Sequence, residues 1–200
     1  LGRSLTRGGE CAPYPATIGA LMAMLKDKGE DTTRGHALFM PTASGPCRFG
    51  QYCLLDRIVL NRMGYTDIPI VSWSSVDNYQ YMSDNIRRKM WLGTVISDIL
   101  FKIRCRIKPY ERKEGQTEAT YQKHARNLVH AFENGLDIKR MMKKARDEFL
   151  DIPVKTGQKP LVGIVGEIYV RNNRFINKDL VRRIEQAGAE VWLTPISEWL

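Results

Sequence analysis

The stretch Met40-Pro41-Thr42-Ala43-Ser44-Gly45-Pro46-Cys47-Arg48-Phe49-Gly50-Gln51-Tyr52 combines the end of a strand, a tight turn and the beginning of a helix. The apolar run 37–40 predicts a strand, which the Pro/Gly-rich turn ends. Apolar residues after Tyr52 recur at helical spacing and predict an amphipathic helix that ends near Gly64. A strand followed by a turn and a helix is the repeating pattern of an α/β fold.

The same alternation occurs at both ends of the chain, because helices are predicted between strands that we expect to pair in parallel. Residues 83–150 instead follow a helical pattern broken at Lys108-Pro109-Tyr110-Glu111. We therefore expect α/β architecture, with Rossmann-like parallel-sheet units and a helical insert. The predicted α/β segments are helix 15–28, strand 36–40, the helix from Cys47, strand 68–73, strand 160–165, loop 166–175, helix 178–186 and strand 190–193. From its apolar composition we expect the strand at 160–165 to be buried. The expected domains are an α/β unit with the cysteine motifs (1–82), the insert (83–154) and the start of a second α/β unit (155–200).

Composition limits the class of protein. In 200 residues, 43% are hydrophobic and 26% are charged, as in a globular protein. The apolar runs are too short for a membrane span, and the first residues lack the apolar core of a signal peptide. The four cysteines match no zinc-finger spacing, so we expect reduced thiols in a cytoplasmic protein without a membrane partner. Because the chain starts at Leu1 and stops after a strand-like run, we expect it to be a fragment of a longer protein.

The net charge of +9 raises the question of an anionic partner. The basic residues are scattered, with clusters at 87–89, 102–113 and 139–146 that we interpret as solvated helix faces. A basic cleft for a nucleotide or coenzyme A (CoA) is the alternative. We predict no nucleic-acid partner.

Cys47 and Cys11 are the main candidates for chemistry. Each lies in a Gly/Pro-framed segment and is expected to open a helix, where free backbone N–H groups and the helix dipole stabilise an anionic ligand. This placement favours a metal cluster or thiol chemistry, whereas the alternative is a small residue buried at a helix start. Cys53 is expected to be rotated about 120° from Cys47 on the same helix and so to be buried. Cys105 is expected to be a semi-exposed thiol.

Other candidates carry weaker signals. The segment Gly163-Ile164-Val165-Gly166 partly resembles a nucleotide-binding turn, but it lacks the full glycine pattern. Glu167, Tyr169 and Arg171 stand at alternate positions after the strand, so we expect them to share one side of a ligand cleft. His124 lies in charged helical sequence and is expected at the surface.

Four segments together resemble proteins related to the 2-hydroxyacyl-CoA dehydratases and their activators. The likeness covers essentially the whole chain, and its most specific block is GPCRFGQY at 45–52. The segments are Gly9-Glu10-Cys11-Ala12-Pro13, 40–52, 108–111 and 162–171.

The resemblance implies stacked Rossmann-like units that hold an iron–sulfur cluster, most commonly 4Fe–4S, between them. In the dehydratases three cysteines bind the cluster. An activator of the actin/sugar-kinase class of ATPases supplies one electron, and a ketyl radical then allows water to leave the 2-hydroxyacyl-CoA. Related double-cubane proteins use the same scaffold for ATP-driven reduction.

Carried onto this chain, the resemblance assigns Cys11 and Cys47 as metal ligands, and Ser44, Arg48 and Gln51 lie close enough to support them. Further ligands are expected outside these residues, and no catalytic residue is assigned. The first hypothesis is an iron–sulfur redox component for ATP-driven, low-potential electron transfer, within a lyase or a reductase. The alternative is a non-catalytic nucleotide- or CoA-binding regulatory module whose cysteines are structural.

Overall fold

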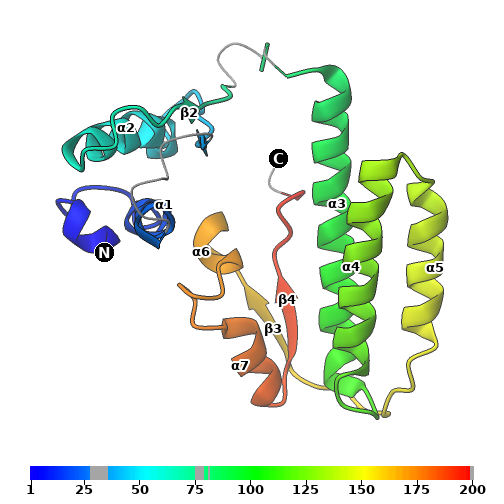
Figure 1. Cartoon of the computed structure of the whole chain (residues 1–200). Coiled ribbons are helices and arrows are strands. Elements are labelled where there is room, and N and C mark those ends of the chain that lie inside the picture. Colours follow the sequence, from blue (N-terminus) through cyan, green and yellow to red (C-terminus); the bar gives the residue numbers. More distant parts are fainter. Residues whose placement is uncertain (28–35, 75–78, 81, 199–200) are drawn as a thin grey trace. The chain divides into compact units, whose positions relative to one another are not determined.

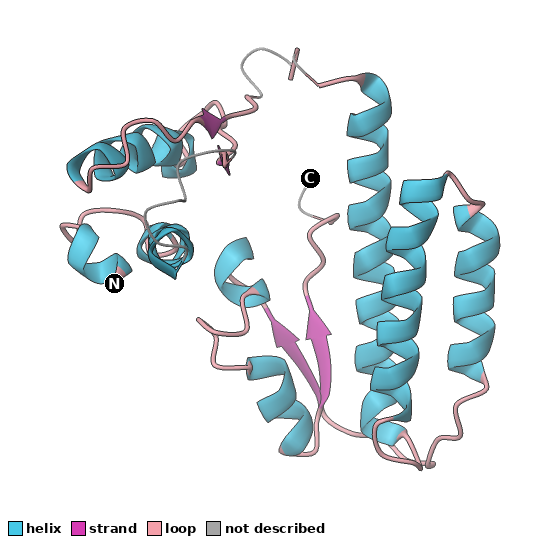
Figure 2. Ribbon diagram, in the orientation of Figure 1, coloured by secondary structure: helices cyan, strands magenta, loops and turns pink. Residues whose placement is uncertain are grey.

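The computed structural model describes residues 1–27, 36–74, 79–80 and 82–198. These residues form a mixed α/β protein that is mostly helical, with seven α-helices and two separate pairs of parallel strands (Figures 1 and 2). The chain divides into two compact units, Leu1–Ser83 and Asp84–Leu200. None of the described helices is both long enough and apolar enough to cross a membrane.

The Leu1–Ser83 unit follows the helix–strand alternation that the sequence predicts. A 3₁₀ helix, η1 (Gly2–Leu5), precedes α1 (Tyr14–Asp27) and β1 (Leu38–Phe39). The second half contains η3 (Arg48–Gln51), α2 (Tyr52–Arg62) and β2 (Ile70–Val71). Residues 28–35 and 75–78 lie outside the described part of the chain, so the predicted end of the first helix at Lys28 is not described.

The predicted parallel pairing of the first two strands is confirmed. Leu38 pairs with Ile70 and Phe39 with Val71. Both strands are shorter than predicted, although the alignment continues through a hydrogen bond from Thr42 N to Trp73 O at 2.9 Å. The turn containing Cys47 therefore starts where this short sheet ends.

The core of this unit forms between α1 and α2. The buried side chains of α1 (Tyr14, Ile18, Met22 and Leu25) recur at three- and four-residue intervals, as on one face of an α-helix. They pack with Leu38 of β1 and with Tyr52, Val59 and Leu60 of α2.

The Asp84–Leu200 unit begins with the predicted helical segment. It contains α3 (Asp84–Ile107), the 3₁₀ helix η4 (Lys108–Tyr110), α4 (Gln116–Asn134) and α5 (Ile138–Leu150), and the three long helices lie side by side (Figure 1). Gly135, with φ of 64°, ends α4, and the Asp137 carboxylate accepts a hydrogen bond from Arg140 N at 3.0 Å to begin α5. The predicted break at 108–111 is confirmed, because α3 ends at Ile107 and η4 follows it.

The end of the chain adds β3 (Leu161–Ile164), α6 (Ile168–Asn172), α7 (Leu180–Gln186) and β4 (Glu190–Leu193). The strands pair in parallel, from Leu161 with Glu190 to Ile164 with Leu193. The expectation of a buried first strand is wrong, because Ile164 is the one fully buried residue of β3 and Leu161 is 61% exposed. The prediction of a connecting loop at 166–175 is also wrong, because Ile168–Asn172 form the helix α6. The Glu167 carboxylate caps this helix by accepting a hydrogen bond from Val170 N at 2.8 Å.

Arg104 joins the helical and α/β parts of this unit. Its guanidinium is buried and forms ion pairs with Glu118 of α4 at 3.0 Å and with Glu185 of α7. Burial raises the pKa of Glu185 even though Arg104 opposes that rise. The desolvation of this carboxylate therefore outweighs its attraction to Arg104, as is common for buried ion pairs.

Two expectations from the sequence are wrong here for the same reason. Cys105, expected to be semi-exposed, is buried beside Arg104, and burial raises the pKa of its thiol to about 11. His124, expected at the surface, is buried, and its Nε2 lies 2.9 Å from the Glu148 carboxylate of α5. In both cases a charged residue lies beside the buried group: Arg104 precedes Cys105 on α3, and Glu148 reaches His124 from α5.

Replacing Arg104 with Met is expected to lower the free energy of unfolding by about 3 to 5 kcal/mol, because Glu185 is then buried without a partner. Urea unfolding followed by circular dichroism measures this change. The double variant Arg104→Met/Glu185→Leu removes both charges and should recover most of the loss. Equal destabilisation of the single and double variants would contradict the assignment of the cost to an unpaired carboxylate.

Candidate functional site

Cys47 lies at the beginning of a helical segment, as predicted. Cys47 is the N-cap of η3, which continues directly into α2. The residue is exposed. The Cys47 carbonyl accepts a hydrogen bond from Gly50 N at 3.2 Å, which closes the first turn. The difference from the prediction is that this first turn is a 3₁₀ turn and not part of the α-helix.

Cys11 lies on the turn that precedes α1. Its carbonyl accepts a hydrogen bond from Tyr14 N at 2.9 Å, and the residue is half-buried against the α1–α2 core. The Glu10 carboxylate folds the preceding loop by accepting hydrogen bonds from Arg7 N at 3.0 Å and Gly8 N at 2.9 Å. These main-chain donors lower the pKa of Glu10, and the N–H of Arg7 has the largest effect. The Cys11 loop is therefore held in a defined conformation.

A single side chain connects the two cysteine segments. Arg48 Nη1 donates a hydrogen bond of 2.7 Å to the carbonyl of Gly9, although the two residues are 39 positions apart in sequence. Cys47 immediately precedes Arg48, and Cys11 follows Gly9 by two residues. The structure thus brings the two segments into direct contact. It also gives Arg48 a main-chain partner, which the sequence did not indicate.

The Cys47 turn packs closely on the segment that leads into it. Thr42 Oγ1 donates to the carbonyl of Gly50 at 3.0 Å. A Cβ atom at Gly50 would lie 2.5 Å from the carbonyl oxygen of Ala43, closer than real Cβ contacts allow. Glycine is required at this position for steric reasons.

An aromatic cluster lies next to the cysteine segments in sequence and joins the helices that follow them. Tyr52 makes edge contacts with Tyr14 and with Phe49, with ring centroids 4.9 Å and 5.3 Å apart. Edge-to-face pairs of this kind add to the energy of apolar burial. They fix α1, η3 and α2 relative to one another, and so they fix the residues that carry the two thiols.

Asp56 is a residue of this region that the sequence analysis missed. It lies on α2 four residues after Tyr52, is fully buried, and has neither carboxylate oxygen in hydrogen-bonding geometry with a described residue. Burial raises the pKa of Asp56 to about 6, although the nearby Tyr14 hydroxyl acts to lower it. Asp56 shares the buried face of α2 with Tyr52, Val59 and Leu60.

The described residues do not form a complete metal site. Among them, no group of three or more His, Cys, Asp or Glu side chains could hold a metal ion. Cys11 and Cys47 are therefore two candidate thiolates without a third partner in the described part of the chain. Ser44 and Gln51, the other candidates near Cys47, are exposed, and Cys53 is partly buried against the core.

The expected grouping of Glu167, Tyr169 and Arg171 is wrong. The grouping assumed an extended chain, but Glu167 is the N-cap of α6 and the other two lie within it, so Tyr169 faces nearly opposite to Arg171. The buried guanidinium of Arg171 donates to the carbonyls of Gly166 at 2.7 Å and Pro195 at 3.3 Å. Arg171 therefore supports the ends of the two strands, while Glu167 is the helix cap.

Comparisons with protein-family models, with curated proteins and with solved structures found no match for this chain.

Replacing Asp56 with Asn tests the buried carboxyl. Because folding raises its pKa from 3.8 to about 6, the folded state binds the proton more tightly, so its contribution to stability is lost as pH rises from about 4 to 6. About two pKa units correspond to about 3 kcal/mol. The free energy of opening of α1 and α2, measured by amide hydrogen exchange, should fall over this range in the native protein relative to Asp56→Asn. Parallel pH profiles would show that Asp56 does not titrate as described.

Gly50→Ala is expected to lower the stability of the Leu1–Ser83 unit by about 1 to 3 kcal/mol, because the added methyl group overlaps the Ala43 carbonyl. Hydrogen exchange of α2 gives the measurement. Gly9→Ala is the matched control in the other cysteine segment, because nothing lies within 4 Å of a Cβ atom built there. Similar losses in both variants would contradict the steric explanation.

Proposed function

We propose that this protein is an iron–sulfur redox component related to the 2-hydroxyacyl-CoA dehydratases and their activators, with Cys11 and Cys47 as two of the cluster ligands. The observation that carries the proposal is the hydrogen bond between Arg48 and Gly9, which holds the two cysteine-bearing segments together. Of the four segments that carry the family resemblance, the two joined by this hydrogen bond are the ones that contain a cysteine.

Physical chemistry supports thiol-based binding at this place. Cys47 is exposed and Cys11 half-exposed, so both thiols are accessible to an incoming group. Soft thiolates are preferred ligands of iron–sulfur clusters. The Arg48 guanidinium adds a positive charge next to Cys47, where an anionic centre would be stabilised.

The described residues do not fit a complete cluster. A cluster needs three or four protein ligands, and no group of three or more His, Cys, Asp or Glu side chains in the described part of the chain could hold a metal ion. The proposal therefore assigns the remaining ligands to a further segment or to a second chain, and we derive no catalytic step through the cluster. What such a centre supplies when it is bound is low-potential electron transfer.

The wider proposal follows the family resemblance. The two parallel strand pairs are parts of Rossmann-like units, and the electron donor is an ATPase activator of the actin/sugar-kinase class. The alternative is a regulatory module that binds a nucleotide or CoA and has structural cysteines. The net charge of +9 supports it, because such ligands are anionic.

The test is the iron and acid-labile sulfide content of the complete protein, purified without oxygen, together with its electronic absorption spectrum. We expect stoichiometric iron, with most of it lost in Cys11→Ala and in Cys47→Ala. Cys53→Ala is the matched control, because it removes a thiol from α2 without touching either proposed ligand. Iron-free native protein would reject the proposal and favour the alternative.

A further inference from the structure

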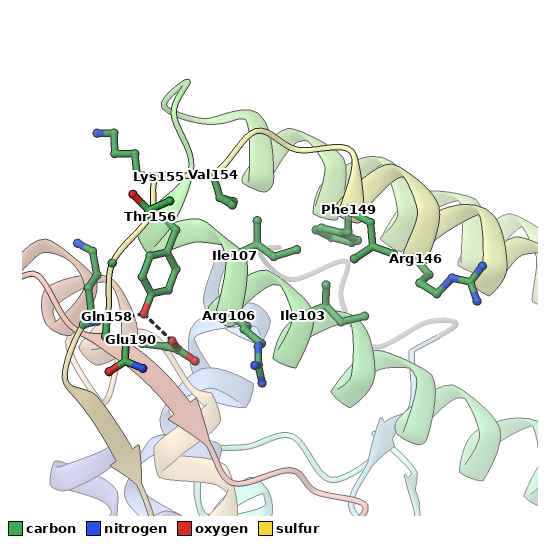
Figure 3. A pocket seen from close by; sticks show the side chains of 14 residues that line it. Ile103, Arg106, Ile107, Arg146, Phe149, Val154, Lys155, Thr156, Gln158 and Glu190 are labelled. Atoms are coloured by element: carbon green, nitrogen blue, oxygen red, sulfur yellow. Dashed lines mark hydrogen bonds between the residues drawn. The ribbon is translucent and has the colours of Figure 1, made fainter.

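The Asp84–Leu200 unit contains a pocket of about 740 Å³, a volume typical of small-molecule sites. Its lining comes from α3, the end of α5 and the segment 154–159, together with Tyr110 of η4 and Glu190 at the start of β4 (Figure 3). It lies at the amino end of the two strands. It is therefore distinct from both cysteine segments and from the strand ends where sequence reasoning placed a cleft.

One wall of the pocket is apolar. Ile103 and Ile107 of α3 lie beside Phe149 of α5 (Figure 3), and the wall continues through Leu150 and Val154. Leu150 is 73% exposed and Val154 is 45% exposed. A bound apolar group would cover this surface and remove it from water.

The lining is also cationic. Arg106, Lys155 and Lys159 line the pocket and form no ion pair within the described part of the chain, whereas Arg146 is paired with Asp147. The one carboxylate in the lining is that of Glu190, which accepts a hydrogen bond from the Tyr110 hydroxyl at 2.9 Å. The local balance of charge therefore favours an anion.

The segment between the two lysines offers hydrogen-bond donors. Lys155 N donates to the Tyr110 carbonyl at 2.7 Å and Lys159 N to the Tyr110 hydroxyl at 3.1 Å, so Tyr110 fixes both ends of the segment. The N–H groups of 156–158 between them donate to no described residue. Successive free N–H groups flanked by cations are a common arrangement for binding phosphate oxygens.

From these observations we propose that the pocket binds a phosphate ester of an apolar or aromatic group. The phosphate lies against the 155–159 segment and Arg106, and the organic group lies against Ile107, Phe149 and Leu150. Tyr110 is a positioning residue, because its two backbone contacts hold the segment in place. This inference is independent of the proposed cluster site, since it uses neither cysteine.

The test uses 1-naphthyl phosphate, which combines an aromatic group with a phosphate, and measures binding to the 200-residue chain by calorimetry. We expect one saturable site with a sub-millimolar Kd. Inorganic phosphate and 1-naphthol, which each carry half of the probe, should bind far more weakly. The absence of saturable binding of 1-naphthyl phosphate at millimolar concentrations would overturn the proposal.

Variants locate the site. Arg106→Gln and Lys159→Gln are each expected to weaken binding about tenfold, because each removes a charged hydrogen-bond donor. Leu150→Ser should also weaken binding. Because Leu150 is exposed, we expect this variant to keep its fold, which circular dichroism checks. Arg140→Gln is the control, because it removes a cation from α5 outside the pocket. Equal affinity in Arg106→Gln and Arg140→Gln would place the probe elsewhere and contradict the proposal.

Discussion

The buried guanidinium of Arg104 is the constraint on which the Asp84–Leu200 unit depends. It ties α3 to Glu118 of α4 and to Glu185 of α7, so one side chain links the helical segment to the α/β segment. Around it, Phe101 of α3 packs with Ile164 and Val191 of the two strands. Without a wide sheet to organise the unit, this polar contact and the small apolar cluster beside it determine where β3 and β4 lie against α3.

In the described part of the Leu1–Ser83 unit, apolar packing surrounds one buried carboxyl group, that of Asp56. The aromatic contacts of Tyr52 hold α1 and η3, while Asp56 lies within the same helix interface without a hydrogen bond in good geometry. Buried carboxylates normally reduce stability unless they are paired. The unit tolerates one on α2, next to Tyr14 of α1, so this position is not explained by stability alone.

The sequence predicted the local elements better than their surroundings. Helical spacing identified α1, α2 and the long helices, and the alternation of helix with strand identified both parallel pairs. Burial was less predictable, because Arg104 and His124 are carried inside by partners far away in the sequence, Glu185 and Glu148. For the site, the sequence indicated the two cysteines, but the Arg48–Gly9 contact depends on a loop fold that periodicity does not describe. The pocket was missed because its segment 154–159 has no regular pattern.

The Arg104–Glu185 contact also has a consequence for how the chain folds. The two residues are 81 positions apart, and β3 and β4 pair across 29 positions, from Leu161 to Glu190. By contrast, α4 and α5 are joined by a connection of three residues, between Asn134 and Ile138. Closing a long loop costs more conformational entropy than closing a short one, so helix pairing is favoured early and strand pairing late. During synthesis, α3 to α5 leave the ribosome before α7 and β4 exist, so Arg104 can pair with Glu118 of α4 before Glu185 of α7 is available.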